Sequence, residues 1–161
     1  MADRRPGVPG GRGGPPVSAP SDYFADPGSM PPPTLPGRFV DLAAEVPAVS
    51  FRPGLVFRPV LGQGVLVMAV AFDPHAEAPR HAHEEEQVTV VVEGELEFEI
   101  AGETRLLRPG MVAVIPPRVP HAARTHDVAC LEYDTFHPPR QALLDLAAAG
   151  GAAAEGGAPR G

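Results

Sequence analysis

Hydrophobic residues between positions 55 and 136 fall into short runs that are separated by glycine, proline and charged residues. The clearest run is 95–100, where Leu96, Phe98 and Ile100 alternate with three glutamates. Successive side chains of a strand point to opposite faces, so this pattern predicts a strand with one buried face. Similar signals predict further strands at 55–60, 65–72, 87–93, 104–107, 111–115, 122–124 and 128–136.

Three details refine this pattern. The run 65–72 is almost wholly apolar, which is typical of a strand covered on both faces. The last two predicted strands suit a hairpin around residues 125–127. After them, Pro139 suits the start of a helix over 140–149, which Gly150 is expected to end. Many short strands between turn residues predict an all-β barrel or sandwich with a short C-terminal helix.

The two ends of the chain differ in composition from this middle part. Residues 1–37 are dominated by proline, glycine, serine and alanine, and residues 150–161 by alanine and glycine. Such segments bury too little apolar surface to offset the entropy that is lost on ordering. We therefore predict a disordered Pro/Gly-rich tail at 1–37, a folded domain at 38–149 and a disordered tail at 150–161.

Charge and composition argue against several classes of partner. The net charge is −7 and the basic residues, all arginine, are scattered, which argues against nucleic-acid binding. Cys130 is the only cysteine, so no intramolecular disulfide can form. Residues 1–14 lack the apolar core of a secretory signal, and no apolar run approaches the roughly 20 residues of a membrane span. We expect a cytoplasmic protein without a membrane partner.

Four residues are candidate metal ligands. His81 and His83 are separated by one residue, so on a strand their imidazoles share a face and can meet one metal ion. Gln87 has the same parity and would join them if the strand were regular. His121 lies far along the chain, where a neighbouring antiparallel strand can bring it across as a fourth ligand.

The spacing of these residues resembles the two consensus motifs of the cupin family. The first motif, G-x5-H-x-H-x3,4-E-x6-G, aligns in register with His75, His81, His83, Gln87 and Gly94. The second, G-x5-P-x-G-x2-H-x3-N, aligns with Gly110, Pro116, Arg118, His121 and Thr125. The departures are His75 and Arg118 at glycine positions, Gln87 at the glutamate and Thr125 at the asparagine. The resemblance implies a single cupin (jelly-roll) β-barrel.

In cupins the matching residues bind a metal inside the barrel, so the resemblance implies one divalent ion held by His81, His83, Gln87 and His121. Zinc, nickel, iron and manganese are all open as its identity. Three imidazoles and an amide are neutral, so the ion would keep its full double charge and act as a strong Lewis acid. Glu85 is an alternative ligand or base, although an acidic loop in solvent is the simpler interpretation.

A narrower resemblance covers the segment 134–140, which is similar to the end of the single-domain cupins that convert unsaturated uronates to keto sugars. It implies that Asp134 moves a proton, that Phe136 lines the substrate site and that Arg140 holds a substrate carboxylate. The competing interpretation is structural: Phe136 would belong to the core, Arg140 to the surface and Asp134 to a strand end. Arg118 is a further candidate for contact with an anionic substrate.

These residues support three functional hypotheses. The leading one is a metal-dependent enzyme that moves protons on a carbonyl or enol substrate, as in sugar-acid ketonisation, isomerisation or polyketide cyclisation. The alternatives are a quercetin-cleaving type of metal dioxygenase and a non-catalytic cupin that binds a small molecule. Val88, Val90 and Val92 form the other, apolar face of the Gln87 strand, and small cupins are commonly dimers, so a homodimer is expected.

Overall fold

The computed structural model describes residues 26, 28 and 30–155 of the chain. It divides into two compact units, residues 1–37 and residues 38–161. In the first unit, the described residues (26, 28 and 30–37) are all exposed. Most of the predicted tail at 1–37, and the end of the tail at 150–161, lie outside the described residues.

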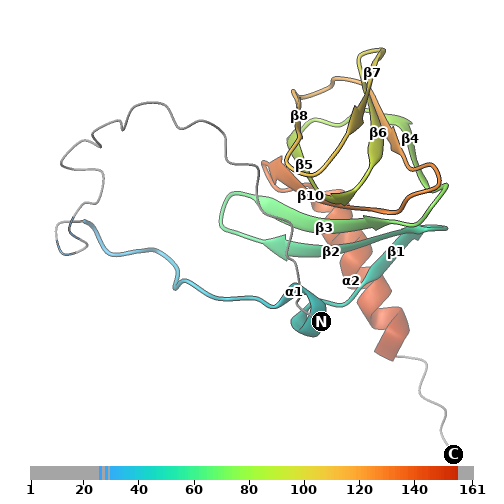
Figure 1. Ribbon diagram of the computed structural model, residues 1–161. Coiled ribbons are helices and arrows are strands. Elements are labelled where there is room, and N and C mark those ends of the chain that lie inside the picture. Colours follow the sequence, from blue (N-terminus) through green and yellow to red (C-terminus); the bar gives the residue numbers. More distant parts are fainter. Residues whose placement is uncertain (1–25, 27, 29, 156–161) are drawn as a thin grey trace, which may run out of the picture. The chain divides into compact units, whose positions relative to one another are not determined.

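The second unit is built from two antiparallel sheets that face each other (Figure 1). The six-stranded sheet has the order β1 (Val49–Arg52), β2 (Leu55–Leu61), β3 (Leu66–Phe72), β10 (Cys130–His137), β5 (Glu86–Gly94) and β8 (Val112–Ile115). The four-stranded sheet has the order β4 (Glu77–His81), β9 (His121–Arg124), β6 (Leu96–Ile100) and β7 (Glu103–Leu107). Two helices flank them, α1 (Leu42–Glu45) and α2 (Gln141–Glu155).

The core lies between the inner faces of the two sheets. Leu66 and Ile115 from one sheet and Leu96 from the other are fully buried in it. Each strand contributes alternate residues, because every second side chain points inward. Within α2, Leu143 joins the same cluster, so the helix packs against the rim of the barrel beside β1 and β2.

All eight predicted strands are present, with ends within two residues of the expected ones. Sequence analysis missed β1, β4 and α1. The sequence of β4, EAPRH, has neither alternation nor β-branched residues, so its strand conformation depends on pairing with β9 rather than on local preference.

Two expectations about connections and ends are wrong. The strands β9 and β10 do not form a hairpin, because β9 pairs with β4 and β6 while β10 pairs with β3 and β5. The chain instead crosses between sheets there, and the Thr125 hydroxyl donates a hydrogen bond to the Asp73 carbonyl, 2.6 Å away. The helix α2 also does not end at Gly150, which lies close to Val49 of β1, but continues to Glu155.

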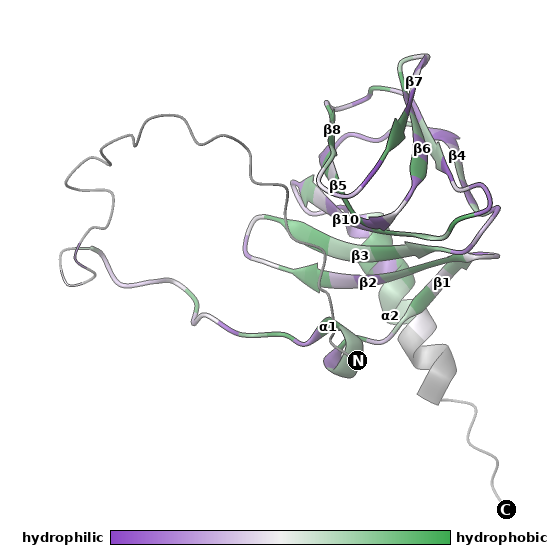
Figure 2. Ribbon diagram, viewed as in Figure 1, coloured by the Kyte–Doolittle hydropathy of each residue, from purple (hydrophilic) through white to green (hydrophobic). Residues whose placement is uncertain are grey.

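The apolar strand β3 is fully covered on only one face within a single chain. Its inward residues are buried, whereas on the outer face Val67 and Ala69 are half-buried and Ala71 is exposed. Strand β8 consists of the apolar residues VAVI, and Val88, Val90 and Val92 alternate with the inward residues of β5. The apolar character of β3 is visible in Figure 2. The outer face of the six-stranded sheet is therefore more apolar than a solvated face requires.

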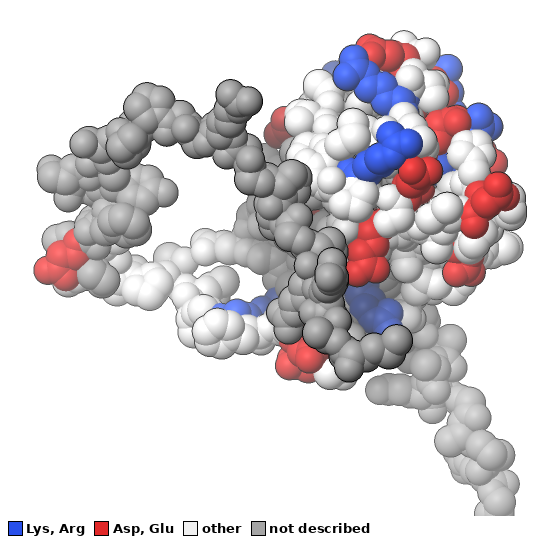
Figure 3. Space-filling model, in the orientation of Figure 1, with Lys and Arg blue, Asp and Glu red and all other residues white. Residues whose placement is uncertain are grey.

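Positively and negatively charged side chains are mixed on the surface (Figure 3). On the face in Figure 3, arginines lie close to acidic side chains. The ion pairs of the described residues include Arg108–Glu95 and Arg124–Glu97. Among the described residues on that face, no continuous basic stripe is present of the kind that follows nucleic-acid phosphates. No helix of the described part of the chain is long and apolar enough to cross a membrane.

The glycine positions of the two motifs share one backbone conformation. Gly94 and Gly110 have φ values of 77° and 87°, and His75 and Arg118, which replace consensus glycines, keep φ at 61° and 66°. Positive φ favours glycine because a Cβ crowds the following carbonyl. The fold thus keeps the turn geometry of the motifs even where the glycine itself is lost.

Substitution of Gly94 tests whether this position requires glycine. A Cβ at Gly94 would lie 1.8 Å from the Ala129 carbonyl oxygen, so Gly94→Ala should lower the free energy of unfolding by at least about 3 kcal/mol. Gly102 also has positive φ, 91°, but nothing lies within 4 Å of its Cβ position, so Gly102→Ala should cost only about 1–2 kcal/mol. Urea denaturation of both variants measures the difference, and equal losses would contradict the clash at Gly94.

Candidate metal centre

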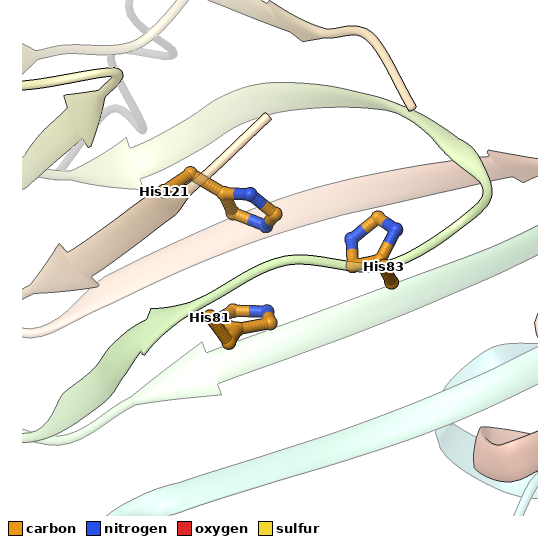
Figure 4. Close-up of side chains that lie close together, drawn as sticks. All are labelled: His81, His83 and His121. Atoms are coloured by element: carbon orange, nitrogen blue, oxygen red, sulfur yellow. The ribbon is translucent and has the colours of Figure 1, made fainter. Parts of the chain in front are cut away.

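Three histidines converge at one end of the barrel (Figure 4). His81 is the last residue of β4 and His121 the first of β9, and the two are paired across the antiparallel ladder. His83 lies in the loop after β4, where its carbonyl accepts a 2.7 Å hydrogen bond from the Arg118 backbone N–H. The antiparallel approach of His121, expected from the sequence, is confirmed.

The expectation that His81, His83 and Gln87 share one regular strand is wrong. Strand β4 ends at His81, a loop follows, and Gln87 belongs to β5 in the opposite sheet. Gln87 nevertheless reaches the histidines, because the chain turns from one sheet to the other and the barrel closes around this point. The Gln87 Oε1 atom lies 3.0 Å from Nε2 of His83.

Backbone carbonyls orient all three imidazoles in the same way. The Nδ1 atoms of His81, His83 and His121 lie 2.7, 2.9 and 2.8 Å from the carbonyl oxygens of Pro79, Glu85 and Val119. A carbonyl oxygen can only accept, so each Nδ1 must carry the proton and each Nε2 the lone pair. This outer contact is the usual way in which proteins orient metal-binding histidines.

The free nitrogens fit a divalent metal ion. One ring nitrogen from each histidine lies within 4.8 Å of the other two. The buried Nε2 of His121 has no hydrogen-bond partner among the described residues. A buried polar atom without a partner is costly, whereas coordination to a cation would satisfy its lone pair.

Gln87 is oriented to serve as a fourth ligand. Its amide nitrogen donates to Thr89 Oγ1 at 3.0 Å and to Asp134 Oδ1 at 2.9 Å. The amide oxygen therefore faces Nε2 of His83, and in the tautomer described above both atoms are acceptors. Two acceptors at this distance repel each other unless a cation binds to both. The two atoms therefore fit a metal ion as ligands.

Two of the histidines are held neutral. The pKa of His121 is lowered to about 4, mainly by burial, with smaller contributions from the neighbouring His81 and His83. Burial also lowers the pKa of His81, with smaller contributions from Arg140 and His83. Neutral imidazoles are the form that binds metals, because protonation would remove the lone pair.

Asp134 lies on β10, directly beside the candidate metal ligands. Its Oδ1 atom accepts hydrogen bonds from the Gln87 amide and from the Thr89 hydroxyl. Burial raises the pKa of Asp134, whereas the two hydrogen bonds and the charge of Arg140 lower it. The resulting pKa is about 6. Sequence analysis missed Thr89, although its position two residues after Gln87 on the same strand places it on the same face.

Phe136 and Arg140 lie at the same end of the cavity. The Phe136 ring is buried, 5.5 Å from the His83 ring, and the Arg140 guanidinium carbon lies 6.0 Å from the Phe136 ring centre. The Arg140 Nε atom lies 4.0 Å from a Glu85 carboxylate oxygen, which is also 3.4 Å from Nδ1 of His83. Phe136 is thus both a core residue and a wall of the site.

Arg118 does not reach the cavity. Its side chain is 77% exposed and pairs with Glu84 at 2.7 Å, outside the barrel. Its positive φ turns the backbone so that the N–H, rather than the side chain, supports the His83 loop. Arg118 is thus not among the residues that line the cavity, and its contact with an anionic substrate stays a prediction.

Glu132 is a polar residue of the interior that sequence analysis did not single out. It is 2% exposed on β10, and its Oε2 atom has no hydrogen-bond partner among the described residues. Burial raises its pKa well above the ordinary value, and the charge of Asp134 raises it further. Its position two residues before Asp134, with the same parity, was the available signal.

These groups surround one cavity of about 240 Å³. His81, Gln87 and His121 line it together with Asp134 and Arg140. The rest of the lining is mainly apolar and includes Leu55, Phe57, Met68, Val70, Phe72 and Phe98. A concave, mostly apolar cavity with a few convergent polar groups is the usual form of a small-molecule site.

Comparison with known proteins identifies the family. The cupin domain family matches residues 68–132 of the chain. The structure of KdgF from a Halomonas species is similar at 30% sequence identity and a TM-score of 0.63, over 67% of this chain and 99% of that protein. The chain belongs to the cupin superfamily. The predicted fold, a single cupin barrel with a C-terminal helix, is confirmed.

Two other structures extend this comparison. An RmlC-like cupin from Shewanella frigidimarina is 27% identical, with a TM-score of 0.62, over 66% of this chain and 96% of that one. The polyketide cyclase RemF from Streptomyces resistomycificus is 22% identical, with a TM-score of 0.56, over 63% and 79%. The latter similarity shows the fold alone. No curated protein sequence matches the chain.

The metal centre is tested by elemental analysis of the purified cupin. The wild type should contain about one divalent ion per chain, and His83→Ala should lose it, because one of three converging nitrogens is removed. The control His126→Ala should retain the ion, since His126 is exposed and contacts Glu97 outside the barrel. Wild-type protein that stays free of metal after loading with zinc, nickel, iron and manganese would contradict the site.

Proposed function

We propose that this cupin is a metal-dependent enzyme that moves a proton on a small carboxylic acid with a carbonyl or enol group. One observation carries the proposal: the buried Asp134 carboxylate is joined through the Gln87 amide to the candidate metal ligands. An acid–base group and a Lewis acid that face the same cavity are the two parts that enolisation requires.

The metal ion would be held by His81, His83 and His121, with Gln87 as the fourth ligand. When bound, it would polarise a carbonyl or enol oxygen and stabilise the negative charge that develops there. Because these four ligands are neutral, none of them offsets the charge of the ion. The choice among zinc, nickel, iron and manganese stays open.

Asp134 is assigned the proton transfer. Both of its hydrogen bonds end at Oδ1, so we assign Oδ2 as the atom that takes and returns the proton. A pKa of about 6 makes Asp134 an ionised base at neutral pH that still holds a proton well enough to deliver it. Thr89 and Gln87 position the carboxylate by fixing its other oxygen.

Arg140 is assigned to the substrate carboxylate. Its guanidinium lines the cavity near Phe136, and its planar fork matches the two oxygens of a carboxylate. Glu85 lies within ion-pair distance of Arg140 and would be exchanged for the substrate. The neighbouring carbons of an acid seated there would lie in the cavity that the metal ligands and Asp134 also line.

The class of reaction follows from these assignments. Ketonisation or isomerisation of a sugar acid and cyclisation of a polyketide-like chain both begin with proton transfer next to a carbonyl. The similarity of segment 134–140 to uronate-converting cupins supports the first type. The 30% identity to KdgF over nearly the whole length of that protein is consistent with such a small single-domain enzyme.

Proton transfer is tested directly by exchange of carbon-bound hydrogen in D₂O. We expect the metal-loaded wild type to exchange the α-protons of phenylpyruvate or to convert an unsaturated uronate, as followed by NMR. Asp134→Asn should lower the rate by about 10²–10⁴-fold with unchanged metal content, because the amide cannot act as a base.

The matched control for this experiment is Asp127→Asn, which alters a 93% exposed carboxylate in a turn and should leave the rate unchanged. If Asp134→Asn keeps the wild-type rate, Asp134 has no role in proton transfer. If the wild type binds these acids without any exchange or conversion, the protein is a binding cupin rather than an enzyme.

We also propose that the cupin forms a homodimer through the outer face of the six-stranded sheet. Val88 and Val90 pair across the ladder with Val114 and Val112, which are 55% and 52% exposed. Val92 is exposed on the same side of β5. A contiguous stripe of valines on two adjacent strands is typical of a protein interface.

Light scattering tests this assembly. The wild type should have about twice the 16.8 kDa mass of one chain, and Val114→Glu should shift it to the monomer by placing a charge in the interface. Val128→Glu introduces the same charge at a 49% exposed residue between β9 and β10 and should leave the dimer intact. A monomeric wild type would overturn the proposal.

A further inference from the structure

The cavity contains a polar group that proton transfer does not use. Glu132 lines the wall formed by β10, on the same side as Asp134. Its Oε2 atom is buried and has no hydrogen-bond partner among the described residues. The Asp134 carboxylate, in contrast, is held by Thr89 and Gln87.

Both residues that pair with Glu132 on the neighbouring strands are apolar. Its partners on the two neighbouring strands are Val70 of β3 and Val91 of β5, both buried. Phe72 and Phe98 line the same cavity. Most buried polar side chains have a partner, and the exceptions call for an explanation.

We propose that Glu132 determines substrate specificity by forming a hydrogen bond with a single hydroxyl or carbonyl oxygen at the far end of a carboxylic acid whose body is apolar. This inference rests on the proposed function, since it takes the metal, Asp134 and Arg140 as the reacting end of the site. It adds the chemical class of the substrate and the residue that selects it.

The geometry sets the span of such a molecule. The Cα atoms of residues two apart on a strand are about 6.6–6.8 Å apart, so Glu132 and Asp134 line the cavity at positions that differ by about the length of one ring with its oxygen substituent. The cavity volume of about 240 Å³ lies below the roughly 300–1,000 Å³ of typical drug-sized sites. Both values fit an acid with one ring and an oxygen on the side opposite to the carboxylate.

The apolar lining disfavours a polyhydroxylated substrate. Apart from Arg52, Glu132 and the polar groups at the reacting end, the lining consists of apolar residues such as Phe57 and Phe98, which cannot pair with the several hydroxyls of a hexuronate. Unpaired polar groups in a closed site reject a ligand strongly, whereas one matched hydrogen bond selects it. The site thus suits an aromatic or alicyclic acid better than a sugar acid, although the segment 134–140 resembles sugar-acid enzymes.

Protonated Glu132 suits this role. A carboxyl in an apolar environment is held neutral, and burial together with the Asp134 charge raises the pKa of Glu132 in that direction. A neutral carboxyl both donates and accepts, so it complements either a ligand hydroxyl or a ligand carbonyl.

Isothermal titration of the metal-loaded full chain with three acids tests the proposal. The probes are 3-(4-hydroxyphenyl)propanoate, 3-phenylpropanoate, which lacks the distal hydroxyl, and galacturonate. For the wild type we expect the hydroxylated acid to bind about 10-fold more tightly than its deoxy partner, as one matched hydrogen bond allows. Galacturonate should bind more weakly than either.

Two substitutions assign the effect to Glu132. Glu132→Leu should abolish the preference for the hydroxylated acid, and Glu132→Gln, which keeps a donor and an acceptor, should retain most of it. Glu93→Leu makes the same change on β5 at an exposed position outside the cavity and should leave all three affinities unchanged. If Glu132→Leu does not fold, Glu132→Met removes the carboxyl at a similar side-chain length.

The outcomes separate this inference from the proposed function. The role of Glu132 is overturned if Glu132→Leu keeps the preference for the hydroxylated acid, or if the wild type binds galacturonate more tightly than the other two acids. Neither outcome affects the proposed function, which rests on metal content and on Asp134-dependent exchange. Failure of all three acids to bind, together with absence of metal-dependent exchange, overturns both. A higher melting temperature of Glu132→Leu would support a functional role, since an unpartnered buried carboxyl is then kept at the expense of stability.

Discussion

The pairing of β5 with β10 is the constraint on which the site depends. It sets Gln87 opposite Phe136 and Thr89 opposite Asp134, so that a candidate metal ligand and a candidate base meet across one ladder. A slip of one residue would turn all of these side chains to the outer face. The Gln87 and Thr89 hydrogen bonds to Asp134 exist only in this register, and the chemistry of the cavity follows from them.

The interior combines a packed core with polar groups that a purely structural barrel would avoid. Leu66, Leu96 and Ile115 supply the hydrophobic burial that holds the sheets together. At the same time β10 buries Glu132 and Asp134, and each raised carboxyl pKa reflects the free-energy cost of a charge without water. Buried carboxyl groups that lower the stability of an apolar core are typical of functional sites.

The motif positions show which physical feature each consensus residue provides. His75 and Arg118 stand where glycine is usual, yet their backbones keep positive φ, and Arg118 still donates its N–H to the His83 carbonyl. The backbone geometry is therefore retained at some strain, while the side chain is free to differ. At Gly94 no such freedom exists, because the Ala129 carbonyl occupies the place of a Cβ.

The sequence by itself determined eight of the ten strands, the barrel class and the candidate histidines, because alternation and motif spacing are local properties of the chain. It could not show that β4 ends at His81 or that Gln87 comes from the opposite sheet, since both depend on where the barrel closes. It could not show either that the Arg118 side chain pairs with Glu84, a contact between residues 34 apart in the chain. Only the tertiary structure decided the surroundings of Glu132, because packing brings Val70 and Val91 to either side of it. Within the described part of the chain, its Oε2 atom has no hydrogen-bond partner.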